Sequence, residues 1–393
     1  MEMSIKYKHQ NLSIENNIMF NSSSYLNNTS LKWRRELLKN HWTENAIDFT
    51  NSIKNLQLLN ENELKLLNHI LELFFILEGD VIGNGFRNLY RFGFKNKSPS
   101  FLSYISEYCN NEIVHAISYQ KAYEELVLQN KMLTEDILKK LYRKYEQIEV
   151  FNNRKEELDR LGNENVDLNW KDFIDLSLIE GIQFRSLFLF IFYFCKDGNF
   201  KELGELNRYI FNDETRHTYA AIEFALLLKK EFSISDKEFF EYLFDKIDDF
   251  YQKECKVIKY LSLFLENENI ENENIENENI ENENIENENI EIEAEKYLCW
   301  LCKDILNKYS IYITEKEFPQ KFKFDKKEYK FRFKEYISST DSFIVHILKF
   351  DNDDIPFYME KYIINNIHEN LHETKLTKYK EPSKIYLGID DLF

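Results

Sequence analysis

The sequence predicts an all-α protein, a bundle of long helices, and three observations support this. Glycine and proline, the residues that most often end helices, number only 9 and 4 in 393 residues. Long segments carry apolar residues at helical spacing. Two Glu-x-x-His motifs lie inside such segments, and each motif places a carboxylate and an imidazole on one helix face.

The helical pattern begins after an Asn- and Ser-rich segment. We expect residues 1–30 to be flexible, because their polar composition offers little apolar surface to bury. Helical periodicity then extends from Leu31 to Leu265. Within it, three segments are apolar nearly all round, which is typical of central rather than surface helices. These segments are 67–84, 173–194 and 206–228.

A low-complexity array interrupts the helical pattern. Residues 266–290 are five copies of Glu-Asn-Glu-Asn-Ile, and a period of five aligns the isoleucines on neither a helix face nor a strand face. We interpret 266–293 as a disordered insert without a function of its own. Helical periodicity resumes at 295–309. The predicted organisation is therefore a helical domain over 31–375 and a flexible tail over 376–393.

Charge and cysteine content exclude several classes of protein. Ten glutamates of the array account for ten of the 18 net negative charges, which leaves an ordinary acidic protein at −8. No basic surface for nucleic acid and no polybasic patch for membranes is expected. The longest apolar run, nine residues from Leu187 to Cys195, is too short to span a bilayer. Five cysteines without a disulfide pattern, and no signal peptide, predict a soluble cytoplasmic protein, with Cys299 and Cys302 as helix-face residues.

The Glu-x-x-His pairs are typical of a dinuclear metal site. The two pairs are Glu112/His115 and Glu214/His217. Ferritin-like bundles that bind two iron or manganese ions take such a pair from each of two helices and one carboxylate from each of two others. Glu78 and Glu180 are acids embedded in the remaining apolar segments. Buried carboxylates are costly unless compensated, and a metal pair would compensate them. Ligands of this kind favour iron or manganese over zinc.

A tyrosine lies one helical turn from this predicted site. Tyr119 is four residues after His115, and a phenol beside an oxidising metal centre can be converted to a stored radical. Phe184 and Phe188, four and eight residues after Glu180, would shield it from water. The alternative interpretation is that Tyr119 is one of several core tyrosines.

A competing motif lies near the C-terminal end. His368 to His372 reads HENLH, the His-Glu-x-x-His pattern of zinc proteases. A third ligand should follow it, yet none of the remaining 21 residues is histidine. We interpret the motif as a polar turn of helix.

These residues together resemble the small, radical-generating subunit of class I ribonucleotide reductase, over about Leu31 to Phe393. The resemblance implies that Glu78 is the first metal-binding carboxylate, at a position where the family usually has Asp. Asp80 is the alternative ligand if the alignment slips by two residues. It also implies that Trp42 begins a radical relay, and that Asp213 links this tryptophan to His115.

The resemblance extends to the C-terminal tail. Leu387, Ile389 and Phe393 resemble the apolar anchors of a peptide that docks into the large catalytic subunit. Tyr379 is the candidate for the tail tyrosine that passes the radical between subunits, and Tyr386 is the other.

The function that the resemblance implies is that of a ribonucleoside-diphosphate reductase small subunit. O2 activated at two iron ions, or at manganese or a mixed pair, would oxidise Tyr119, and the radical would reach the large subunit. The chain would act as a homodimer or a heterodimer. Two alternatives stay open: a non-catalytic small subunit paired with a second one, and a di-iron oxidase of the same fold that acts on a small molecule.

Overall fold

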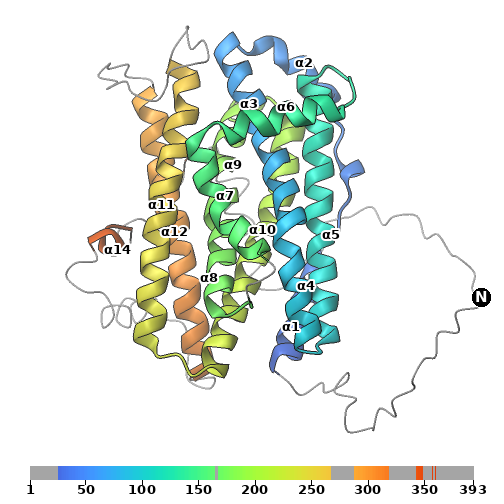
Figure 1. Cartoon of the computed structure of the whole chain (residues 1–393). Coiled ribbons are helices and arrows are strands. Elements are labelled where there is room, and N and C mark those ends of the chain that lie inside the picture. The colour runs from blue at the N-terminus through green and yellow to red at the C-terminus, as the bar shows by residue number, and fades with distance from the viewer. Residues whose placement is uncertain are drawn as a thin grey trace, which may run out of the picture.

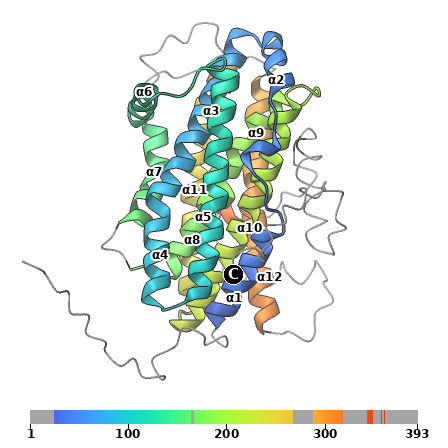
Figure 2. The same cartoon turned by 90° about the vertical axis from the view of Figure 1, so that its right-hand side faces the viewer.

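The computed structural model describes residues 25–163, 167–266, 287–317 and 342–347, with the single residues 356 and 359. Every regular element in these ranges is helical, and no strand occurs among them. The long helices run side by side along one axis (Figure 1), and the view turned by 90° shows a second layer of helices behind the first (Figure 2). The prediction of an all-α, ferritin-like bundle is therefore confirmed.

Seven long helices form the body of the bundle. They are α1 (Tyr25–Leu38), α3 (Glu61–Asp80), α5 (Pro99–Ala122), α7 (Glu149–Gly162), α10 (Lys201–Glu231), α11 (Asp236–Glu266) and α12 (Asn287–Glu317). Shorter helices are α2 (Thr50–Asn55), α4 (Phe86–Lys95), α6 (Glu135–Glu146), α8 (Trp170–Leu178), α9 (Arg185–Phe194) and α14 (Ser342–Ile347). Three π-helical segments extend or join them: η5 (Val81–Gly85), η6 (Tyr123–Val127) and η7 (Ile179–Phe184).

Two boundaries differ from those expected. Residues 25–30, expected to be flexible, form the first turns of α1, and Asn27 there accepts a hydrogen bond of 2.6 Å from Ser98 before α5. Packing of α1 against α5 and α10 overrides the polar composition of this stretch. Helix α12 begins at Asn287, so the last copy of the repeat contributes to a helix. Residues 267–286 lie outside the described part of the chain.

Strong N-terminal caps set where the helices around the bundle centre begin. The side chain of Asn60 caps α3 in a reciprocal capping box with Glu63. Asn169 caps α8 in the same way with Asp172. Helix α5 begins at a proline, and the hydroxyl of Ser98 accepts a hydrogen bond from the backbone of its first turn. These caps fix where α3, α5 and α8 begin; α3 and α5 carry acids expected at the centre, and α8 leads directly into η7, which carries Glu180.

The apolar segments are central helices, as predicted. The stretch Trp170–Phe194, formed by α8, η7 and α9, is long and apolar enough by composition to cross a membrane, yet 94% of its most apolar window is buried within the bundle. It packs against α10, α11 and α12. A buried helix of a bundle core meets the same composition test, so this stretch is explained by its protein neighbours.

Segment η7 is held from two sides. A Cβ atom at Gly181 would lie 2.6 Å from Ile305 and 2.9 Å from Thr218, so only glycine allows α10 and α12 to approach so closely. On the other side, the buried Arg154 pairs with Glu254 at 2.7 Å and donates a hydrogen bond to the backbone carbonyl of Gln183. Segments of π-helix inside α-helices are frequent at functional sites.

Substitution of Gly181 tests this close packing. Gly181→Ala should lower the free energy of unfolding by about 1–3 kcal/mol, the usual cost of overpacking a core. Gly83→Ala in η5 is the matched control, because a Cβ atom there meets nothing within 4 Å. Urea denaturation of both variants is the measurement, and equal stability of the two would contradict the packing argument.

Candidate metal centre

Six side chains from four helical elements meet in the middle of the bundle. Glu78 comes from α3, Glu112 and His115 from α5, and Glu180 from η7; Glu214 and His217 come from α10. All six have no solvent-exposed surface. These are the six ligands that the sequence predicted, and the structure brings all of them together.

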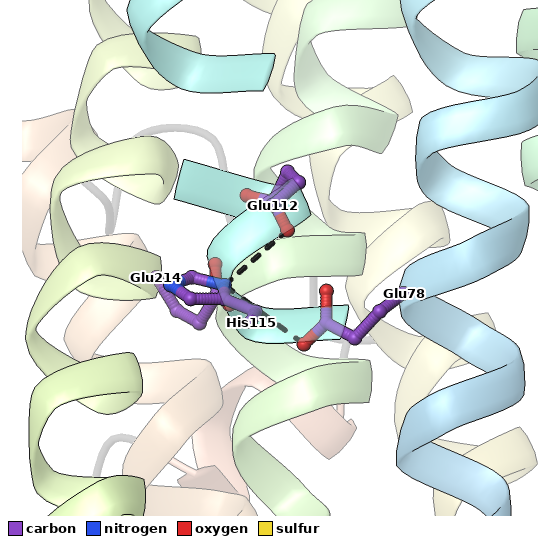
Figure 3. Close-up of side chains that lie close together, drawn as sticks. All are labelled: Glu78, Glu112, His115 and Glu214. Carbon is purple, nitrogen blue, oxygen red and sulfur yellow. Dashed lines mark ion pairs between the residues drawn. The ribbon is translucent and has the colours of Figure 1, made fainter. Parts of the chain in front are cut away.

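The six side chains form two overlapping groups of potential ligands. One group contains Glu78 and His115, the other contains Glu180 and His217, and Glu112 and Glu214 belong to both. Within each group, the ligand atoms lie within 4.8 Å of one another. Figure 3 shows the first group, with Glu78 facing His115 across the bundle.

Glu112 and Glu214 each lie between the two histidines. One oxygen of Glu112 lies 3.4 Å from Nδ1 of His115, and its other oxygen lies 2.8 Å from Nδ1 of His217. The oxygens of Glu214 divide in the same way, at 3.1 Å and 2.9 Å. Each carboxylate thus offers one oxygen to each half of the site, which is the arrangement a dinuclear centre requires.

Both imidazoles turn Nδ1 inward and Nε2 toward a partner outside the group. Nε2 of His115 lies 3.4 Å from Asp213, and Nε2 of His217 lies 3.5 Å from the amide of Asn111. Such partners fix the ring orientation of a metal-binding histidine. Asn111 was not predicted from the sequence, although it directly precedes Glu112.

The buried polar atoms of the site fit a pair of cations. Both oxygens of Glu78 and Glu112, one oxygen each of Glu180 and Glu214, and Nδ1 of His115 make no hydrogen bond. Leaving such an atom buried and unsatisfied costs about 1–3 kcal/mol, and more for a charged group. Two divalent ions would supply the missing partners of these atoms. Oxygen-rich ligation with one imidazole per ion suits iron or manganese.

Electrostatics show how strongly the centre needs positive charge. Burial, followed by the charge of Glu112, raises the pKa of Glu78 well above its usual value. Burial and the charge of Glu214 do the same to the pKa of Glu180. Burial alone would lower the pKa of His217, but Glu112 and Glu214 raise it to about 9. Protons thus occupy the centre until cations replace them, and metal binding releases protons.

Tyr119 is sealed inside the bundle. Its side chain has no exposed surface, and its ring stacks on Phe74 at a centroid distance of 4.6 Å. Phe74 in turn stacks on Phe188, one of the two phenylalanines expected to shield the tyrosine; Phe184, the other, is also buried. Burial raises the pKa of Tyr119 well above its usual value, so the phenol keeps its proton.

The hydroxyl of Tyr119 donates a hydrogen bond of 2.8 Å to the amide oxygen of Asn207. Sequence reasoning missed Asn207, although it lies seven residues, or two turns, before Glu214 on the same face of α10. It also missed Tyr108, four residues before Glu112, whose hydroxyl donates to Glu180. Helical spacing from a known ligand is the signal that points to both residues.

Trp42 contacts both Asp213 and His115. Its indole nitrogen donates a hydrogen bond of 2.7 Å to the Asp213 oxygen that lies 3.4 Å from Nε2 of His115. Its ring also stacks on the imidazole of His115 at 5.8 Å. A buried aromatic ring and a carboxylate thus connect the centre to the N-terminal part of the chain.

Some predicted residues take no part in this cluster or cannot be placed. Asp80, the alternative to Glu78, belongs to neither group of potential ligands. Tyr379, Tyr386, the tail residues 387–393 and the HENLH motif lie outside the described residues.

Residues 19–282 match the family described as ribonucleotide reductase, small chain, which is more than half of the sequence. The chain belongs to this family. The resemblance seen in the sequence is therefore confirmed at the level of the family.

The relatives of this chain share little sequence identity with it. The ribonucleoside-diphosphate reductase small subunit of Plasmodium falciparum is 26% identical over 177 residues, which cover 45% of this chain and 52% of the relative. The chain spans about half the length of the curated relatives it matches.

Two solved structures show the shared fold. Dimanganese(II)-NrdF of Streptococcus sanguinis has a TM-score of 0.57 and 15% identity, with 77% of this chain and 92% of that chain covered. An R2-like ligand-binding oxidase with an Mn/Fe cofactor has a TM-score of 0.56 and 14% identity, with 74% and 94% covered.

Metal titration tests the centre. We expect two Mn(II) ions per chain, and a melting temperature that rises with Mn(II), since an ion at 100 times its Kd stabilises by about 2.7 kcal/mol. Glu78→Gln should weaken binding of one ion. Glu72→Gln is the control on the same helix, because Glu72 is buried but bonded to Tyr123, Tyr145 and Lys144 instead. Equal metal content in the two variants would argue against the assignment.

Proposed function

We propose that the chain is the small subunit of a ribonucleoside-diphosphate reductase, which stores an oxidising equivalent on Tyr119 and delivers it through Trp42 to a large subunit. One observation carries the proposal. The fully buried Tyr119 lies close enough to the ligand set for Glu78, Glu214 and Glu112 to raise the pKa of its phenol, and a hydrogen-bonded path from His115 through Asp213 to Trp42 leads away from the same set. Family membership supports it.

The six buried ligands would hold the two ions, iron or alternatively manganese or a mixed pair, and the bound ions supply an oxidant from O2. Burial raises the pKa of Tyr119 well above its usual value, so the phenol holds its proton until the oxidant at the bound ions would remove one electron and one proton from it. The neutral amide of Asn207 orients the phenol through its O–H group. The stacked rings of Phe74 and Phe188 exclude water from the phenol.

Asp213 connects the centre to Trp42. Burial raises the pKa of Asp213, but its hydrogen bond to His115 and the charge of Arg216 outweigh burial, and the net pKa is lowered. Asp213 is thus an anion between an indole N–H group and an imidazole. It fixes the orientation of both rings and stabilises positive charge that develops on either of them.

The proposal includes a partner and a cellular compartment. The tail over 376–393 would dock through Leu387, Ile389 and Phe393 into a groove of the large subunit, with Tyr379 or Tyr386 in the relay. The small subunits would associate as a homodimer or a heterodimer. The free cysteines of the chain fit a reducing compartment such as the cytoplasm.

A second candidate is an oxidase that acts on a small molecule, because R2-like ligand-binding oxidases share the fold at similar TM-scores. A third is a non-catalytic small subunit in a heterodimer. The buried phenol of Tyr119 and the hydrogen bond from Trp42 to Asp213, both at one centre, favour the reductase over both.

Substitution of Tyr119 tests the stored radical. After loading with Fe(II) and exposure to O2, the unmodified chain should show a long-lived tyrosyl EPR signal, and Tyr119→Phe should abolish this long-lived signal without loss of bound iron. Tyr145→Phe changes another buried tyrosine, whose hydroxyl donates to Glu72 rather than to a residue of the centre, and it should keep the signal. A signal that survives in Tyr119→Phe with the unmodified line shape would refute Tyr119 as the radical site.

Substitution in the tail separates the reductase from the oxidase. Phe393→Ala should weaken capture of a ribonucleotide reductase large subunit, because an apolar anchor is removed from the docking peptide. Ser383→Ala, a substitution in the same tail at a residue that is not a proposed anchor, should not. Equal capture of the large subunit by both variants would count against docking through this tail.

A further inference from the structure

Trp42 lies between two aromatic rings. On one side is the imidazole of His115, with the ring centroids 5.8 Å apart and the planes at 21°. On the other side is the phenol ring of Tyr209, at 5.5 Å and 25°. The relay described above uses only the first contact, so the role of the second ring is unassigned.

The ring of Tyr209 lies nearer the surface than the ring of Trp42. His115 has no exposed surface, Trp42 is buried, and Tyr209 is half-buried. Glu205, one turn before Tyr209 on α10, has 39% of its side chain exposed. Glu205, Tyr209 and Asp213 follow one another at intervals of four residues, so they lie along one face of the helix.

Tyr209 has a base within reach of its proton. Its side chain hydrogen-bonds to the carboxylate of Glu205. Burial raises the pKa of Glu205, but the hydrogen bonds from Arg208 and Tyr209 and the charge of Arg208 outweigh burial, and the net pKa is lowered. Nε of Arg208 lies 3.0 Å from Glu205, and the guanidinium lies 4.8 Å from the centroid of the Tyr209 ring.

Arg208 also links loss of an electron from Tyr209 to loss of the phenol proton. A cation over the ring opposes positive charge on Tyr209. The phenol can therefore lose an electron only if its proton leaves in the same step, and Glu205 is placed to accept that proton.

We infer that Tyr209 is the redox group that follows Trp42 on the way to the surface, an inference that rests on the proposed function. The oxidant is the one-electron-oxidised indole of Trp42, which takes an electron from Tyr209 while the phenol proton passes to Glu205. The products are neutral Trp42, a neutral tyrosyl radical at Tyr209 and a protonated Glu205. Asp213 thus connects Trp42 to His115, and Tyr209 supplies the electron that restores Trp42.

A phenylalanine substitution distinguishes a redox role of Tyr209 from a role in packing. Tyr209→Phe keeps the stacked ring and removes only the oxidisable phenol. Tyr219→Phe is the matched control on the same helix. Tyr219 is also half-buried, its hydroxyl also donates to a carboxylate, that of Asp304, and a cation also lies over its ring, but it does not stack on Trp42.

The experiment uses the full chain with Tyr119→Phe, so that oxidising equivalents leave through Trp42. The protein is loaded with Fe(II), mixed with O2 and frozen at intervals for EPR, with and without ring-deuterated tyrosine. We expect a transient tyrosyl signal that narrows on deuteration. Adding Tyr209→Phe should abolish this signal and leave an indole radical in its place, whereas adding Tyr219→Phe should leave the tyrosyl signal unchanged.

The same tyrosyl signal in the variant that lacks Tyr209, or no tyrosyl signal after Tyr119 is replaced, would overturn the inference. The radical of the unmodified chain reports on the proposed function separately, so the two failures are distinguishable. Glu205→Gln adds a readout that packing would not affect. Loss of the base should slow the appearance of the Tyr209 radical roughly 100-fold, the lower end of a general-base effect.

Discussion

The rest of the structure depends on one electrostatic constraint: four carboxylates share a dry space with only two imidazoles. Glu112 and Glu214 lie between both histidines, and several carboxylate oxygens of the centre have no hydrogen-bond partner in the protein. Long capped helices, the close approach allowed at Gly181 and the outward partners of the histidines all serve to hold these acids together. Burial of these unpaired carboxylates lowers the stability of the bundle, and bound cations would restore it.

The two halves of the centre have different surroundings. The half with Glu78 and His115 faces Trp42, whose ring stacks on this imidazole. The half with Glu180 and His217 meets Tyr108, whose hydroxyl is committed to Glu180. Under the proposed function, oxidising equivalents would leave from the half that contacts Trp42, while the other half is hydrogen-bonded to Tyr108.

Much of this could be predicted from the sequence, because the ligand motifs follow helical geometry. Spacings of three and four residues determine which side chains share a face, so the two Glu/His pairs and Tyr119 were predictable one helix at a time. Contacts between helices were not, and the bond from Tyr119 to Asn207 or the ring of Tyr209 on Trp42 depends on how α5, α10 and the segment before α2 pack. The start of α1 was missed for the same reason, because its polar residues are stabilised by contacts distant in sequence.

The repeat joins α11 and α12, a helix pair that carries none of the six metal-site residues (Figure 1). Adding or deleting one pentapeptide copy changes the loop-closure free energy by only about 0.2 kcal/mol. Replication slippage in the corresponding DNA, in whole multiples of fifteen bases, would thus preserve the reading frame and leave every ligand spacing intact. A change in copy number would therefore leave the residues of the centre at their positions in the helices.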